Sequence, residues 1–364
     1  MFFGGRTEVF QPYGESDELN CIQYHDVTSL YPTICTHDEL PIGFPIRYFG
    51  LSAQQQLPRL HPQHPQRIFG YVRCKVLPST TDRLGLLPCR KDNKLMFDLY
   101  PKIGTWFADE LYFAMFHGYR ILEIYEILHW NENARSKDYM KGYMSFFLRQ
   151  KQEAEGWPNH IITNEQKLQF IEYLYMMNGN VAKMRSNKVN KNPVLRQLAK
   201  LYLNCLWGKF AQSSVDSQNI NIFGYHQFLK IRYDTKIKLD SLRFRHIKGE
   251  FYQVIYEKTK EHYRLNRNYN IWIAAAVTAH ARCRLHRQMI KIGPERILYC
   301  DTDSIIFLYS RHAACTLASR GLGNWVDETI DFGSAIKNYL LLLLNHTVSF
   351  WKMVHTVLKP KDAA

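Results

Sequence analysis

Tyr299-Cys300-Asp301-Thr302-Asp303-Ser304 is the stretch that decides the fold of this chain. Apolar runs flank it on both sides, so it predicts a β-hairpin with carboxylates at its tip. Two ionised aspartates at one tip repel each other and are costly to desolvate. Mg²⁺ offsets that cost, because it binds one or two carboxylates together with substrate phosphates. A lone D-x-D is more often an Asx turn, so phosphoryl-transfer chemistry needs support from the rest of the chain.

The bulk composition favours a folded protein with a nucleic-acid partner. A chain of 364 residues is long enough for a sizeable core and two or three subdomains. Its net charge of +14 suits an anionic partner, and its 14% aromatic content supplies rings on which the bases of that partner could stack. The eight cysteines contain no C-x-x-C pair, so an intracellular reducing compartment is expected and a zinc site is not. No secretion signal or membrane span is expected, since the longest apolar runs are too short.

The spacing of apolar residues and the positions of Gly and Pro predict the helices and strands. A strand running into a turn is predicted from residue 24 to 34, with Asp26 near the strand end. Helical spacing is present at 110–117 and 138–155, and an Ala-rich helix at 271–292 ends at Gly293-Pro294. Residues 54–66 are expected to form a surface loop, and the alternating segment 68–99 predicts a small β-containing insertion.

A basic segment lies in the middle of the chain. Residues 173–215 contain no Asp or Glu but seven Lys or Arg, and such a one-signed stretch indicates an anionic partner. Asn192-Pro193 is a helix start, with Asn as N-cap, and the helix is expected to run to about Gly208. Lys200, Asn204 and Trp207 follow at spacings of four and three, so they share one helix face.

These segments together match the needs of a nucleotidyl transferase. Such an enzyme requires carboxylates for two metal ions, cations for a triphosphate and an aromatic surface for the sugar. Asp26 and Asp303 are assigned to the metals, Lys200 and Lys188 to the triphosphate, and Tyr31 to the sugar.

The order of the motifs resembles the polymerase core of protein-primed family B DNA polymerases. Motif A (D-x-x-S-L-Y-P) is found at 26–32, motif B (K-L-x-L-N-x-x-x-G-K-F) at 200–210, motif C (Y-C-D-T-D-S) at 299–304, K-x-Y at 337–339 and a Y-x-G-G-like segment at 2–5. Smaller signatures, such as Gly104-Thr105-Trp106 and Gly156-Trp157-Pro158, resemble the Maverick/Polinton and adintovirus-like branch. Trp207 and Phe2 depart from the phage pattern, where Tyr stands; each keeps a ring and loses a hydroxyl.

The resemblance implies an α+β right-hand polymerase core with a palm, helical fingers and β-containing insertions. The expected parts are palm at 1–37 and 266–364, an insertion similar to terminal-protein region 1 at 38–175, fingers at 176–212, and an insertion similar to terminal-protein region 2 at 213–265. An exonuclease domain and a complete thumb are expected to be absent, and the tail 340–364 is atypical.

The resemblance also implies roles for individual residues. The catalytic and metal-binding set is Asp26, Val27 through its carbonyl, Asp303, and Asp301 in support, with two Mg²⁺ ions or Mn²⁺ as a substitute. The nucleotide-binding set is Tyr31, which acts as a steric gate, Lys188, Lys200, Asn204, Trp207 and Gly208. The DNA-binding set is Gly4, Gly5, Thr302, Lys337 and Tyr339. Expected partners are primer-template DNA, dNTPs and a terminal protein, without a membrane.

The expected reaction is template-directed addition of dNMP to a primer 3′-hydroxyl, or to a protein hydroxyl at initiation, in replication of a viral, plasmid-like or mobile element. The alternative is a catalytically inactive DNA-binding remnant that keeps only the basic surface. A reverse transcriptase would carry adjacent aspartates and lacks the K-L-x-L-N helix. A nuclease is disfavoured, because no clustered Asp/Glu set remains outside the motifs.

Overall fold

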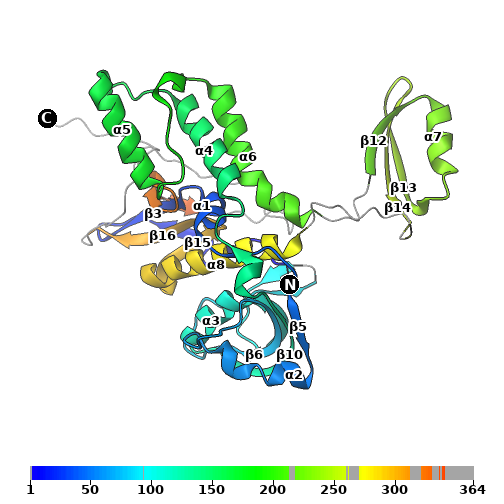
Figure 1. Cartoon of the computed structure of the whole chain (residues 1–364), viewed down its shortest axis with the longest axis horizontal. Coiled ribbons are helices and arrows are strands. Elements are labelled where there is room, and N and C mark those ends of the chain that lie inside the picture. The colour runs from blue at the N-terminus through cyan, green and yellow to red at the C-terminus, as the bar shows by residue number, and fades with distance from the viewer. Residues whose placement is uncertain are drawn as a thin grey trace. The chain divides into compact units, whose positions relative to one another are not determined.

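The computed structural model describes residues 2–92, 94–212, 218–259, 261, 270–311, 321–329, 336 and 338–340. The chain divides into two compact units, one built from residues 1–205 and 275–364 and the other from residues 206–274 (Figure 1). The predicted hairpin at 299–304 belongs to the first unit. Lys337 and the tail 341–364 lie outside the described residues, so their expected roles stay predictions.

A five-stranded antiparallel sheet forms the centre of the first unit. Its strands, in spatial order, are β1 (Thr7–Val9), β15 (Ile297–Asp301), β16 (Ser304–Ser310), β3 (Asn20–Val27) and β17 (Trp325–Asp327). The predicted hairpin is β15–β16. Successive apolar side chains of β16 point to opposite faces of the sheet. Ile305 and Phe307 therefore belong to one core cluster with Leu285, whereas Ile306 belongs to another with Ile22.

Two helices border this sheet. The helix α8 (Ile271–Ile292) has the predicted bounds, and its Ala-rich stretch is buried. Gly293, with φ of +101°, follows it, which explains why the helix stops there. The helix α1 (Leu30–His37) follows β3 after the left-handed residue Ser29. The strand end predicted near Asp26 is confirmed, because β3 ends at Val27, but the following residues form the helix α1 and not only a turn.

The insertion forms its own sheet and core. The strands are β5 (Ile46–Phe49), β10 (Arg120–His129), β6 (Gly70–Leu77) and β9 (Lys102–Phe107), followed in sequence after β9 by α3 (Ala108–Phe116). Shorter elements are α2 (Leu51–Gln54), η1 (Leu57–Leu60), η2 (Glu132–Ala134), β4 (Leu40–Pro41) paired with β11 (Arg135–Ser136), and β7 (Cys89–Lys91) paired with β8 (Lys94–Met96). Val72, Trp106 and Leu111 are buried at its centre. The expected loop 54–66 thus contains a 3₁₀ turn.

Helices follow this second sheet in the sequence: α4 (Lys141–Glu155), α5 (Asn164–Met177), the short η3 (Ser186–Lys188) and α6 (Pro193–Ala211). The predicted cap of α6 is present, because Leu195 N–H donates to Asn192 Oδ1 at 3.0 Å. The helix α5 was not predicted. Its start carries a capping box, in which Thr163 and Gln166 satisfy each other's backbone amides.

Near the ends of the described chain, β2 (Tyr13–Glu15) pairs with β18 (Asn338–Leu340), and η5 (Pro294–Arg296) precedes β15. The second unit contains β12 (Gln218–Phe223), α7 (Tyr225–Arg232), β13 (Ile237–Lys248) and β14 (Phe251–Lys258), in the sheet order β12-β14-β13. Its small core includes Ile222, Phe228 and Val254. Over the described residues, no helix is both long and apolar enough to cross a membrane.

Candidate active site

The two aspartates that the sequence assigned to metal binding meet on neighbouring strands. Asp26 lies near the end of β3, directly opposite Ser304 at the start of β16. Val27 N–H donates to the carbonyl oxygen of Asp303 at 2.8 Å. Segments far apart in sequence are therefore locked side by side by backbone pairing, and both carboxyls are half-buried there.

The electrostatics of this pair are unfavourable without a cation. Burial, with repulsion from Asp303 and Glu328, raises the pKa of Asp26 to about 7. Burial also raises the pKa of Asp303 to about 6, with contributions from Asp301 and Glu328. The Lys200 ammonium lowers both pKa values, so it lies close enough to act on both carboxyls.

Asp26 and Asp303 suit a Mg²⁺ ion whose remaining ligands come from waters and from the phosphates of a substrate. Across the described ranges, no group of three or more His, Cys, Asp or Glu side chains is arranged to hold a metal by itself. A pair of carboxyls with raised pKa values is still a fitting ligand set, because Mg²⁺ usually takes one or two carboxylates and completes its shell with waters and phosphates. Asp26 and Asp303 would hold the ion, with the backbone of Val27 beside them.

Asp301 has a different environment from its neighbour. Its Oδ1 accepts hydrogen bonds from Thr7 Oγ1 at 2.8 Å and from Thr302 Oγ1 at 3.2 Å. Ser304 Oγ donates to the Asp301 carbonyl at 3.2 Å. These bonds stabilise the turn, and a part of Asp301 in catalysis stays a prediction.

The turn is also fixed by the segment before β1. Thr302 has a φ of +54°, and its N–H donates to the Arg6 carbonyl at 2.7 Å. A Cβ on Gly5 would lie only 2.5 Å from Thr302 Oγ1, so glycine is required for this close approach. Arg282 Nη1 donates to the Gly4 carbonyl at 2.8 Å. Gly4, Gly5 and Thr302, three expected DNA contacts, are thus brought together.

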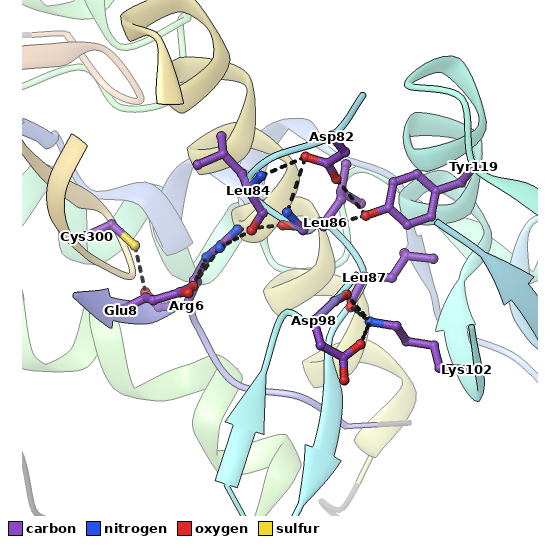
Figure 2. A network of polar contacts seen from close by, with 11 residues as sticks. Arg6, Glu8, Asp82, Leu84, Leu86, Leu87, Asp98, Lys102, Tyr119 and Cys300 are labelled. Carbon is purple, nitrogen blue, oxygen red and sulfur yellow. Dashed lines mark hydrogen bonds and ion pairs between the residues drawn. The ribbon is translucent and has the colours of Figure 1, made fainter. Parts of the chain in front are cut away.

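Arg6 connects this turn to the insertion (Figure 2). Its buried guanidinium donates to the carbonyls of Leu84 and Gly85. Asp82 holds that loop by accepting from Leu84 N–H at 2.9 Å and from the Tyr119 hydroxyl at 2.6 Å. The position of Thr302 therefore depends on a loop of the insertion.

Tyr31 lies in the first turn of α1, beside the same hairpin. Burial is the main cause that raises the pKa of its phenol, and the Asp303 carboxylate adds to it. A hydrogen bond with the Thr302 side chain opposes the shift. The ring is therefore close to the carboxylates, as a sugar platform requires.

The structure adds a cation that the sequence did not single out. Lys151 of α4 is half-buried, and burial lowers its pKa, with Arg196 and Lys200 acting in the same direction and Glu155 opposing. A cavity of about 300 Å³ beside it reaches Thr28 and Ser29 of motif A. Lys151 was missed because only the packing of α4 near α6 reveals its neighbours.

Comparison with known proteins identifies the family. The family model described as DNA polymerase type B, organellar and viral, matches residues 1–169 and 151–293. The chain belongs to this family of type B DNA polymerases. No curated protein matches it.

Solved polymerase structures share the fold of this chain. They are Phi29 DNA polymerase complexed with primer-template DNA (TM-score 0.54, 18% identity, 93% of this chain and 46% of that chain), the same polymerase with primer-template DNA and incoming nucleotides (0.51, 18%, 93% and 47%) and its orthorhombic crystal form (0.52, 19%, 93% and 47%). The predicted α+β polymerase core is confirmed. The chain spans about half the length of these polymerases.

Other site residues expected from the sequence stay predictions. Lys188 is exposed at the end of η3, and Asn204 is exposed on α6. Trp207 and Gly208 belong to the second unit. Tyr339 lies in β18 opposite Gly14 of β2. The expected division into palm, fingers and insertions also stays a prediction.

Glu328 is a second residue that sequence reasoning missed. It follows β17 and raises the pKa of both Asp26 and Asp303, so its carboxylate lies near both. The sequence carried no signal for it, because an isolated Asp-Glu pair after a short strand is common. Only the pairing of β17 with β3 brings it to the site.

Proposed function

We propose that this chain catalyses template-directed DNA synthesis, adding dNMP to a primer 3′-hydroxyl with two Mg²⁺ ions. The observation that carries the proposal is the pairing of β3 with β16, which places Asp26 and Asp303 together with raised pKa values. Groups perturbed by burial and by a like charge are typical of catalytic sites.

Each residue near the pair has a part in this reaction. The primer 3′-hydroxyl gives up its proton to solvent and its oxygen bonds to the α-phosphorus, while the bond from that phosphorus to the oxygen bridging the β-phosphate breaks and pyrophosphate leaves. Mg²⁺ supplies activation of the hydroxyl and neutralisation of the phosphates. Asp26 and Asp303 hold the ions, Lys200 and Lys151 attract the triphosphate, and Tyr31 borders the sugar, where it excludes a 2′-hydroxyl.

The comparisons support DNA and dNTPs as ligands, because the similar Phi29 polymerase structures are complexed with primer-template DNA and with incoming nucleotides. We extend the proposal to initiation on a hydroxyl of a terminal protein, to Mn²⁺ as a substitute metal and to replication of a viral, plasmid-like or mobile element of the Maverick/Polinton kind.

Primer extension tests the proposal. The wild-type chain, given primed DNA, dNTPs and Mg²⁺, should extend the primer, and Asp26→Asn and Asp303→Asn should abolish extension. Asp138→Asn is the matched control, since that exposed aspartate pairs only with Lys141 in the described contacts. Folded wild-type protein that binds primed DNA without extending it would instead establish the inactive DNA-binding remnant.

A further inference from the structure

A polar cavity lies in the insertion and shares no residue with the carboxylate site. It has a volume of about 680 Å³ and is lined by residues from η1, the segment before β6, the end of β10 and the η2 region. The cavity is here called the arginine pocket, and its cationic and imidazole groups are Arg59, Arg67, Arg135, His64 and His129. One carboxylate, Glu132, also lines it, and this side chain is 90% exposed.

In the arginine pocket, an N–H group of Arg59 and the ring N–H group of His129 face each other. His129 is buried, and Phe69 N–H donates to its Nδ1 at 3.1 Å. The neutral ring therefore carries its proton on Nε2. Arg59 Nη2 lies 3.1 Å from that Nε2. An oxygen acceptor beside this pair would accept from both, as the side chain of Asn131 does in part for His129.

Arg135 contributes a guanidinium group that is held in place on the cavity wall. Its side chain is only 13% exposed and is fixed over the Phe69 ring, 4.9 Å from the centroid. Nη1 is 3.3 Å from Glu39 Oε2 and Nη2 is 3.8 Å from Glu132 Oε1, whereas Nε is buried and has no hydrogen-bond partner within the described part of the chain. The guanidinium lines the cavity, so an anion there would be attracted by a positive charge that Glu39 and Glu132 share.

We propose that the arginine pocket binds a backbone phosphate of single-stranded DNA. Guanidinium groups match phosphate oxygens in geometry as well as in charge. The lining residues that the structure describes are charged and polar apart from Pro65, which suits the backbone phosphate of a strand. DNA is chosen as the anion because the proposed function brings DNA to this chain, so the inference rests on that proposed function.

A second cavity explains why a strand, rather than a single free anion, fits this surface. Arg67 also lines a cavity of about 520 Å³ together with Arg284 and Arg287 of α8. Phe116 at its edge is 83% exposed, and Arg287 lies over the Phe113 ring at 4.8 Å. Cations that track a backbone beside exposed rings are typical of single-strand binding. The cavity also contains Asp38, which pairs with Arg284, and Asp109.

Binding of a fluorescein-labelled, unprimed oligodeoxynucleotide to the full chain tests the proposal. Arg67→Gln and Arg135→Gln should each weaken binding about tenfold, the worth of a charged hydrogen bond. Each should also reduce the salt dependence by about 0.7 of a logarithmic unit per lost contact. Arg47→Gln is the matched control, because this arginine lies on β5, is 64% exposed, pairs with Glu126 and lines neither cavity.

The exposed Arg67 keeps the test independent of folding, and thermal melting checks Arg135→Gln. Equal weakening by Arg47→Gln, or unchanged binding by Arg67→Gln, overturns the proposal. So does a poly-glutamate peptide that binds in an Arg67-dependent manner while the oligonucleotide does not. Asp303→Asn should lose extension yet keep Arg67-dependent binding. A wild-type chain that binds the oligonucleotide in an Arg67-dependent manner but extends no primer would refute the polymerase function. The proposed role of the arginine pocket would still hold.

Discussion

Val27 N–H donates a 2.8 Å hydrogen bond to the carbonyl oxygen of Asp303, which ties the end of β3 to the turn between β15 and β16. The bond lies between the two strand segments that carry the paired carboxylates. Neither aspartate can move away from the other without breaking backbone pairing. The repulsion between them is therefore built into the fold, and it has measurable consequences.

The first consequence is a pH-dependent stability without metal. The folded pKa values of Asp26 and Asp303, about 7 and about 6, exceed the ordinary aspartate value of 3.8. Between these limits the folded state binds more protons than the unfolded chain, so stability falls as pH rises. In EDTA, the melting temperature of the wild type should fall as the pH is changed from mildly acidic to mildly basic. The fall should be smaller for Asp26→Asn. Parallel melting profiles would contradict the raised pKa values.

Addition of metal should reverse this trend. Mg²⁺ binds the deprotonated carboxylates, so its stabilising effect grows as pH rises through the two pKa values. The melting temperature of the wild type should therefore increase more with Mg²⁺ at mildly basic pH than at acidic pH. Asp303→Asn should show a much smaller increase. A metal effect of equal size in this variant would place the ion elsewhere.

The approach of Gly5 to Thr302 predicts a contrast between neighbouring glycines. A Cβ at Gly5 would lie 2.5 Å from Thr302 Oγ1 and 2.8 Å from Cγ2, whereas a Cβ at Gly4 meets nothing within 4 Å. Gly5→Ala should lower the free energy of unfolding by about 1–3 kcal/mol, and Gly4→Ala by far less. Urea denaturation measures both. Adding Thr302→Gly to Gly5→Ala should restore part of the loss, because glycine tolerates the φ of +54° at that position.

Arg282 and Glu110 form a buried ion pair that holds the same segment. Their N–O distances are 2.7 and 2.9 Å, and the side chains are 5% and 1% exposed. Arg282 also donates to the Phe3 carbonyl at 2.9 Å. Glu110→Ala leaves a buried guanidinium without its counter-charge, so we expect a loss of about 3–5 kcal/mol in the free energy of unfolding.

The control for that loss is Glu126→Ala, which removes one partner of the exposed pair with Arg47. It should cost no more than about 1 kcal/mol. Similar losses in the two variants would show that the Arg282–Glu110 pair does not depend on burial.

Sequence reasoning succeeded where local chemistry sufficed. The hairpin at 299–304 and the helix 271–292 were predicted from apolar runs and from the Gly293 stop, and both are present. The residues it missed act through tertiary pairing. Glu328 reaches the site only because β17 pairs with β3, and Arg59 meets His129 across a separation of 70 residues. Neither relationship leaves a periodic signal.

The overlooked Lys151 gives the last prediction. Its pKa is lowered by burial and by the nearby cations Arg196 and Lys200, so it is a concentrated positive charge that a triphosphate would stabilise. Lys151→Met removes that charge and keeps the length of the side chain. In steady-state extension assays, we expect the KM for dNTP to rise about tenfold, the worth of a charge-assisted contact, with a smaller change in kcat. Lys141→Met, at the exposed start of the same helix α4, is the matched control and should leave the KM unchanged. An unchanged KM for Lys151→Met would show that the triphosphate does not approach α4.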